Sequence, residues 1–254
     1  MPATKQTRAL KHSLASKAVK RGQGRKLDVI GLIALLILLT GVATATYTLW
    51  NLYGTDYQAN RQAASDVKAF QAPCSDITSL DERTSPPPEI GAVGQGEVFA
   101  TMHVPAWRFM TIPIKEGTSP KVLNTGAGGH YLGSAMPGQI GNFSVAAHRR
   151  SYGSNFRRVD ILKKGDPIII ETKTAWLIYK VDQTRIVNPK DTTVIKPNPI
   201  NPEKQPTGRY LTMTTCHPEY GNSERFIVRN LFDHWIPKES GIPKELATQN
   251  PCTK

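Results

Sequence analysis

Residues 211–218 read LTMTTCHP, and this stretch is the most informative part of the chain for both fold and function. Its first five residues are apolar or β-branched, a composition that favours a β-strand. Pro218 cannot donate a hydrogen bond to a sheet, so we expect the strand to end just after the cysteine. Cys216 is therefore predicted to lie at a strand end, where its side chain can face a cleft.

A second strand begins close behind the first. Arg225 opens the run 225–228 (RFIV), and a loop within 218–224 predicts a hairpin that brings Arg225 beside Cys216. A nucleophilic thiol needs an acid or base partner, and a group that neutralises the oxyanion formed on an attacked carbonyl. The hairpin thus predicts a thiol and a guanidinium close together.

Six histidines are candidates for the acid or base partner. His217 adjoins the cysteine, but neighbouring side chains on a strand point to opposite faces, which argues against it. His148 ends the apolar, strand-like run 144–147 (SVAA), just before a loop rich in Gly, Ser and Tyr, and is the better candidate. Spacing alone leaves the alternatives open, because buried cysteines, structural histidines and surface arginines are all common.

The chain after residue 91 reads as short strands separated by turns. Strand patterns recur over 98–104, 167–170, 176–179, 209–215 and 226–232, glycines crowd 126–141, and four prolines lie within 197–206. Residues 154–162, with apolar residues at helical spacing, could form one short helix. An all-β barrel or sandwich with a few helical turns follows.

These residues resemble the sortase signature, in which a T-L-x-T-C strand ends at the nucleophile and a catalytic arginine opens the next strand. The stretch 141–149 (GNFSVAAHR) is similar to the family pattern G-N-x-x-x-x-G-H-R, with Ala147 in place of the usual glycine and Met213 at a variable position of the signature. The stretches 129–138 (GHYLGSAMPG) and 216–220 (CHPEY) resemble the class E sortases of high-GC Gram-positive bacteria.

The resemblance implies an eight-stranded β-barrel and a cysteine transpeptidase, for which we expect neither cofactor nor metal. Cys216 would attack the threonine carbonyl of a Leu-Ala-x-Thr-Gly or Leu-Pro-x-Thr-Gly sorting motif and form a thioacyl intermediate. His148 would protonate the leaving amine, while Arg225 would hold the substrate and stabilise the oxyanion. Tyr131 occupies a position associated with a preference for alanine after the leucine, and Thr215 would help to line the groove.

The expected partners are secreted proteins with C-terminal sorting signals and an amino group of a peptidoglycan precursor. Two enzymatic alternatives stay open: a pilin-polymerising sortase, and another exported cysteine transpeptidase such as an L,D-transpeptidase. The latter family prefers an arginine two residues after the cysteine, where this chain has Pro218. A surface binding module with a degenerate site is the third alternative, although Cys216, His148 and Arg225 are all present.

Residues 29–50 form an uncharged run (VIGLIALLILLTGVATATYTLW). As a helix it would span roughly 33 Å, about the hydrocarbon thickness of a bilayer. Basic residues precede the run, and Tyr47, Trp50 and Tyr53 supply aromatic side chains at its other end. We predict a single-pass anchor with the N-terminus in the cytoplasm and the catalytic domain outside the cell. A signal peptide cleaved near 43–45 (ATA) and a buried core helix are the alternatives.

The net charge of +12 does not predict a nucleic-acid partner. Residues 1–27 hold eight basic and no acidic residues, and without them the chain has 24 basic against 20 acidic residues, or +4. It therefore lacks the concentrated basic stripe of a nucleic-acid binder. The predicted organisation is a basic cytoplasmic tail (1–28), a transmembrane helix (29–50), an extracytoplasmic linker (51–90), the catalytic barrel (91–236) and a C-terminal tail (237–254). Within the linker, 54–71 could form a helix or a stalk, but its polar composition favours a partly ordered spacer.

The chain has three cysteines, an odd number for an exported protein, so at least one thiol should be free. A disulfide between Cys74 and Cys252 would link the two ends of the exported region and leave Cys216 free. A free-thiol count of three on non-reduced protein would exclude that pairing. The sequence contains no C-x-x-C metal spacing.

Overall fold

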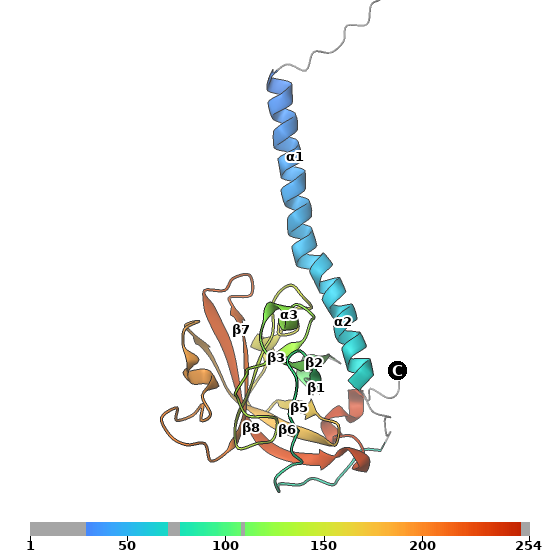
Figure 1. The fold of residues 1–254 in the computed structure, drawn as a ribbon, viewed down its shortest axis with the longest axis vertical. Coiled ribbons are helices and arrows are strands. Elements are labelled where there is room, and N and C mark those ends of the chain that lie inside the picture. Colours follow the sequence, from blue (N-terminus) through green and yellow to red (C-terminus); the bar gives the residue numbers. More distant parts are fainter. Residues whose placement is uncertain (1–28, 71–76, 108–109, 250–254) are drawn as a thin grey trace, which may run out of the picture. The chain divides into compact units, whose positions relative to one another are not determined.

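In the computed structural model, the described residues are 29–70, 77–107 and 110–249. They form a long N-terminal helical region and a closed β-barrel of eight strands, with short helical segments in the connections (Figure 1). The eight-stranded barrel implied by the sortase resemblance is confirmed. Cys74 and Cys252 lie outside the described residues, so their pairing stays a prediction.

The strands follow one another around the barrel in the order β1-β2-β3-β4-β7-β8-β6-β5, and β5 closes on β1. Their bounds are β1 Val98–His103, β2 Thr111–Glu116, β3 Gly128–His130, β4 Gly141–Ala146, β5 Pro167–Glu171, β6 Ala175–Val187, β7 Arg209–His217 and β8 Glu224–Pro237. The pairs β2–β3 and β4–β7 are parallel, and the other neighbouring pairs are antiparallel. Because they run parallel, β4 and β7 present their carboxyl ends at the same edge of the sheet.

Among the described residues, the long helical elements lie towards the N-terminus. There, α1 spans Val29–Leu49, the π-helical turn η1 covers Trp50–Gly54, and α2 continues over Thr55–Phe70. The shorter elements are η2 Pro105–Trp107, α3 Pro120–Leu123, η3 Val159–Ile161, η4 Thr192–Ile195, η5 Lys238–Ser240 and η6 Lys244–Gln249. The short helix predicted over 154–162 is wrong except for the 3₁₀ turn η3, because Ser154 has a left-handed backbone (φ 49°) that starts no helix.

Helix α1 is apolar along its whole length. An 18-residue window of this helical region has a mean hydropathy of 2.4, and α1 itself, which the structure describes throughout, has no buried residue. Its 21 residues cover roughly 32 Å, enough to cross the hydrocarbon core of a bilayer. Helix α1 therefore fits a membrane anchor, the role predicted for 29–50.

Alternate residues of the strands fill the barrel interior. Leu211 and Met213 of β7 and Val228 of β8 are buried in one apolar cluster. Because successive side chains on a strand point to opposite faces, Thr212 and Thr214 lie on the outer face of β7. This alternation fixes which residues at the end of β7 can reach a groove on the outside of the barrel.

Residues 54–70, the described part of the predicted spacer 54–71, are helical rather than partly ordered. Helix α2 packs against β1 and β2, and its Asp66 forms a largely buried ion pair with Lys115 (2.6 Å). Its buried residues recur at every fourth position and form one face: Thr55, Ala59, Ala63 and Val67. Small side chains give a weak hydrophobic signal, which explains why the polar composition of 54–71 was misleading.

The segments on either side of the barrel also pack against it. Thr78 forms a bridge with Ile242, and Arg83 forms one with Trp235 of β8. These pairings give backbone groups at one end of the barrel their hydrogen-bond partners. The compact part of the chain is therefore wider than the predicted barrel domain, 91–236.

Candidate active site

The parallel register of β4 and β7 continues past the end of β4. Ala147 N donates to Thr214 O (3.2 Å), and Thr215 Oγ1 donates to Ala147 O (2.7 Å). Ala147 belongs to the barrel core, and Thr215 is buried beside it. The following residues, His148 and Cys216, therefore project from the outer face of the barrel at adjacent positions. Both are half-buried, and the Cys216 thiol is free.

Strand β8 places Arg225 on the other side of the thiol. The antiparallel register pairs Cys216 with Arg225, and paired residues share a face of the sheet. The Arg225 Nη1 group donates to the backbone carbonyls of Asn222 (2.9 Å) and Glu224 (2.8 Å) in the β7–β8 loop. The fold thus brings together His148, Cys216 and Arg225, the three residues to which the sequence assigned the chemistry.

His148 lies between side chains from two loops. Its Nε2 is 2.9 Å from Asn124 Oδ1, and its ring contacts that of Tyr152 with 5.2 Å between centroids. An amide oxygen only accepts, so Nε2 is the donor in this bond and Nδ1 is the nitrogen that can exchange a proton. Burial lowers the pKa of His148 below its ordinary 6.5, and the nearby carboxylate of Asp56 partly opposes this shift.

Tyr131 lies on the same outer face as Cys216. Its hydroxyl is 2.9 Å from Thr214 Oγ1, and Thr214 precedes Cys216 by two residues, on the same side of β7. Thr215, predicted to line the groove, points inward and is only 4% exposed, with its hydroxyl bonded to Ala147. Thr215 thus links the two strands, and Thr214 is the threonine that meets Tyr131. The alternation of side chains along β7 was the signal that could have separated them.

His217 is turned away from this face, as the alternation predicts. Its Nδ1 accepts a hydrogen bond from Arg149 Nη1 (2.8 Å). Arg149, only 4% exposed, also pairs with Asp160 (3.4 Å) and lies over the ring of Phe226 (5.6 Å). This arginine joins the loop after β4 to the ends of β7 and β8.

A cavity of about 430 Å³ opens beside Tyr131. It lies between the β3–β4 loop, with Leu132 and Ile140, and the segment before β7, with Ile195 and Pro197. Its volume is in the range of ordinary ligand pockets and is sufficient for side chains of a bound peptide.

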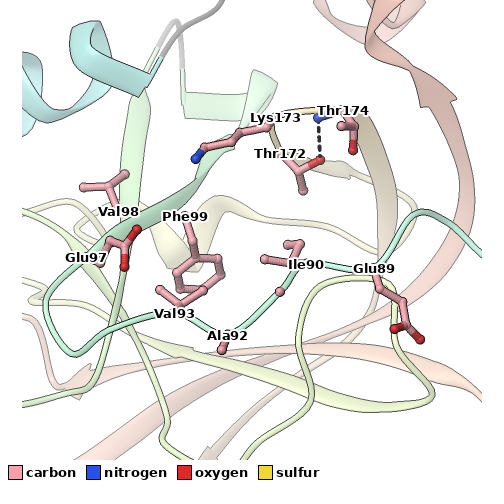
Figure 2. Close-up of a pocket in the computed structure, with 11 residues that line it drawn as sticks. Glu89, Ile90, Ala92, Val93, Glu97, Val98, Phe99, Thr172, Lys173 and Thr174 are labelled. Atoms are coloured by element: carbon pink, nitrogen blue, oxygen red, sulfur yellow. Dashed lines mark hydrogen bonds between the residues drawn. The ribbon is translucent and has the colours of Figure 1, made fainter.

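A second cavity, of about 340 Å³, lies between the segment before β1 and the β5–β6 turn. Figure 2 shows Ile90, Val93 and Phe99 lining it, with Lys173 on the turn. None of the residues predicted to react lines this cavity. Among residues 29–70, 77–107 and 110–249, no group of three or more His, Cys, Asp or Glu side chains is placed to hold a metal ion.

Comparison with known proteins identifies the family. The family model described as "Sortase domain" matches residues 102–231, about half of the chain, and this range contains all three residues predicted to react. The chain belongs to the sortase family. Sortases are transpeptidases and are associated with membranes, which agrees with the anchor-like helix α1.

Three similar proteins are sortases from Streptomyces coelicolor and Actinomyces oris. Sortase SrtE1 from Streptomyces coelicolor is 32% identical over 220 residues, 84% of this chain but only 60% of SrtE1. The solved SrtA sortase from Actinomyces oris is 42% identical, with a TM-score of 0.63, and the match covers 65% of this chain and 95% of that one. Sortase E1 from Streptomyces coelicolor, solved with a tripeptide in the active site, is 35% identical, with a TM-score of 0.56 and coverage of 61% and 99%. The predicted class E membership is confirmed.

Proposed function

We propose that this sortase cleaves the Thr-Gly bond of a Leu-Ala-x-Thr-Gly or Leu-Pro-x-Thr-Gly sorting signal and transfers the threonine-ended protein to a cell-wall amine. The carrying observation is that His148, Cys216 and Arg225 meet on the outer face of the neighbouring strands β4, β7 and β8. These groups supply a proton donor and acceptor, a nucleophile and an oxyanion donor, the set that acyl transfer requires.

In the first half-reaction the Cys216 thiolate attacks the threonine carbonyl carbon, and the carbonyl electrons move onto its oxygen. The Nη1 group of Arg225 is bound to two backbone carbonyls, which orients the guanidinium, and its Nε and Nη2 groups donate to the oxyanion. As the tetrahedral intermediate collapses, the bond to glycine breaks, and protonated His148 gives its Nδ1 proton to the leaving amine. A thioester on Cys216 remains.

The second half-reaction returns every group to its starting state. An incoming amine attacks the thioester and passes a proton to Nδ1 of neutral His148. The carbon–sulfur bond breaks, and Cys216 leaves as a thiolate. The product is a new amide, and the imidazolium and thiolate are restored for the next cycle.

The cavity beside Tyr131 is our proposed site for the residues that precede the threonine. Tyr131 lines this cavity and bonds to Thr214, on the face that carries Cys216, so a peptide in the cavity can extend to the thiol. The tripeptide in the active site of sortase E1 from Streptomyces coelicolor supports a peptide substrate. We propose that Tyr131 favours alanine after the leucine.

The proposed setting is the outer face of the cell membrane. Eight basic residues precede helix α1, which favours a cytoplasmic N-terminus and an exported barrel. The substrates in that compartment are secreted proteins with C-terminal sorting signals, and the acceptor is an amine of a peptidoglycan precursor.

The decisive experiment incubates the full chain, in detergent micelles, with Leu-Ala-x-Thr-Gly and Leu-Pro-x-Thr-Gly peptides. Mass spectrometry should find a thioester on Cys216 and none in Cys216→Ala. Addition of a peptidoglycan stem peptide with a free amine should convert the thioester to an amide; release only by a lysine of another protein would support the pilin-polymerising alternative. Folded protein that forms no adduct with either peptide would overturn the assignment.

A further inference from the structure

The loop after β4 has a strained backbone close to His148. Residues 151–154 have φ values of 64°, 49°, 96° and 49°, so four consecutive residues lie in the left-handed region. Only glycine adopts this region freely, and Gly153 is the single glycine among them. Such a run persists only where contacts from outside the loop hold it.

The holding contacts come from the first turn of helix α2. Asp56 Oδ1 accepts from Gly153 N (2.8 Å), and Asp56 Oδ2 accepts from Ser154 Oγ (2.9 Å). Thr55 Oγ1 accepts from Tyr152 N (3.3 Å). Three successive residues of the loop are therefore bonded to two successive residues of α2.

This loop fixes one side of His148. The Tyr152 ring lies against the imidazole, with 5.2 Å between ring centroids. At the far end of the loop, Phe156 N donates to His148 O (3.0 Å), and the Phe156 side chain is fully buried in the barrel core. A shift of the loop would therefore move both the ring that covers the imidazole and the backbone that carries it.

Helix α2 also contacts the loop on the other side of His148, which carries Asn124. Gly126 has a φ of +74°, and a Cβ atom there would be 2.8 Å from Ala59 O, so the loop backbone lies directly on the backbone of α2. Asn155 Nδ2 donates to Gly126 O, which joins the two loops to each other. Both side chains that orient His148 thus come from loops packed on the same helix.

We propose that Asp56 is a positioning residue for the transpeptidation, which holds the loop 151–154 and thereby keeps His148 directed at the thiol of Cys216. This inference rests on the proposed acid and base role of His148. Helix α2 follows α1 with only the turn η1 between them. The helix that supports His148 is therefore the one that directly follows the proposed membrane anchor. A displacement of about 1 Å at a reacting group can lower a rate by roughly 100-fold, so such support has a measurable effect.

Kinetics of the full chain in detergent micelles test the positioning role. Asp56→Ala removes both acceptors and is expected to lower kcat at least about tenfold, while KM changes less than about twofold. Asp56→Asn keeps the shape: its oxygen can accept from Gly153 N and its amide can donate to Ser154 Oγ, so most of the kcat should return. Ser154→Ala removes one of the two bonds, and its effect should vanish when Asp56→Ala is already present.

The matched control is Asp66→Ala. It removes a carboxylate from the same helix, but its partner Lys115 belongs to β2 and not to the 151–154 loop. Lys115 also donates to Thr125 Oγ1 (3.2 Å), beside Asn124, and this second bond does not involve Asp66 and is expected to persist in the variant. We expect this variant to lower the melting temperature and to leave kcat within about twofold of the parent, since the loop contacts remain. An equal loss of kcat in the two alanine variants would overturn the proposal, because Asp56 would then act only by docking α2.

Hydrogen–deuterium exchange separates this proposal from the proposed function, because it needs no peptide. The amides of residues 152–156 should exchange faster in Asp56→Ala, and at the parent rate in Asp56→Asn and Asp66→Ala. Unchanged exchange in Asp56→Ala overturns the proposal even if the parent turns over peptide. If the parent forms no thioester, the proposed function fails, and the exchange rates still decide whether Asp56 holds the loop.

Discussion

Arg225 differs from a simple positive charge in the way it is held. Its Nη1 group is bound to the carbonyls of Asn222 and Glu224, so the plane of the guanidinium is fixed at the start of β8. A planar fork can bind these carbonyls and an oxyanion together, whereas an ammonium is a single point of charge. The identity of this residue should therefore matter beyond its charge.

Substitution of Arg225 tests that distinction. We expect Arg225→Ala to lower kcat/KM for sorting peptides by roughly 10²–10³-fold, and Arg225→Lys to recover only a small part of the loss. The control is Arg229→Lys on the same strand. The Arg229 side chain pairs with Asp182, so the enzyme with this substitution should keep its activity. Full activity of Arg225→Lys in a peptide-cleavage assay would show that charge alone is sufficient.

The proposed preference for alanine after the leucine of the sorting motif depends on Tyr131. Tyr131→Phe keeps the ring in the cavity and removes the hydroxyl that bonds to Thr214. We expect the ratio of kcat/KM values for Leu-Ala-x-Thr-Gly over Leu-Pro-x-Thr-Gly to fall several-fold, and the stability to change by about 1 kcal/mol. Tyr220→Phe, at an exposed tyrosine of the β7–β8 loop, is the control. An unchanged ratio in Tyr131→Phe would place the selectivity elsewhere in the cavity.

The sequence pointed to the three residues predicted to react but not to the side chains that orient one of them. Pro218 and the loop after it predicted the hairpin that pairs Cys216 with Arg225, and His148 was favoured because it ends a strand-like run. Spacing alone left alternatives open, and the predicted roles of all three residues came from the sortase resemblance. Asn124 and Tyr152 hold His148 through loop backbones whose contacts appear only after the chain has folded. Neither lies in a pattern with a characteristic spacing, so no local signal identified them.

Among the structural elements, β1, β5 and η5 meet around a buried carboxylate. Glu171 Oε2 accepts from Thr101 Oγ1 (2.8 Å) and lies 2.8 Å from His103 Nε2, and Glu171 Oε1 pairs with Lys238. Burial alone would raise the pKa of Glu171, but the hydrogen bond from His103 and the charges of His103 and Lys238 outweigh it and lower the pKa to about 2.

This cluster predicts an acid-dependent loss of stability. A carboxyl group with a lowered folded-state pKa stabilises the fold above its ordinary value of 4.5 and loses that contribution as the pH falls towards 2. We expect the free energy of unfolding to fall by on the order of 3 kcal/mol over this range because of Glu171. Urea unfolding at stepped pH measures it, and Glu171→Gln should show a flatter dependence. Equal slopes in the two proteins would contradict the assignment.

The strands around the site were easier to predict than the elements that support it. Predicted strands 209–215 and 226–232 correspond to β7 and β8, because β-branched and aromatic residues give a strong pattern. Strand β3 consists of Gly128–His130 and lacks such side chains, so nothing in its composition marked a strand. Helix α2 was not the favoured reading of its segment for a related reason, since two of its four buried residues are alanines and the other two are also small.

For the whole molecule, the predicted topology can be tested by cysteine labelling. In a chain with Cys74→Ser and Cys252→Ser, a membrane-impermeant maleimide should label Cys216 in intact cells, because the barrel is expected outside. A cysteine placed at Leu10, in a cysteine-free background, should react only after permeabilisation. Reaction of position 10 in intact cells would reverse the orientation, and release of the barrel into the medium would support the signal-peptide alternative.

The parallel pairing of β4 with β7 also has a consequence for when the enzyme becomes active. Strand β4 ends at Ala146 and β7 begins at Arg209, so this pairing closes a loop of about 60 residues. Contacts between distant parts of a chain form late in folding, because the entropy of loop closure opposes them. The imidazole of His148 follows β4 and the thiol of Cys216 lies on β7, so the two groups become neighbours only when these strands pair. The guanidinium of Arg225 follows on β8. Under the proposed function, a newly made chain should therefore stay inert until its last strand has paired.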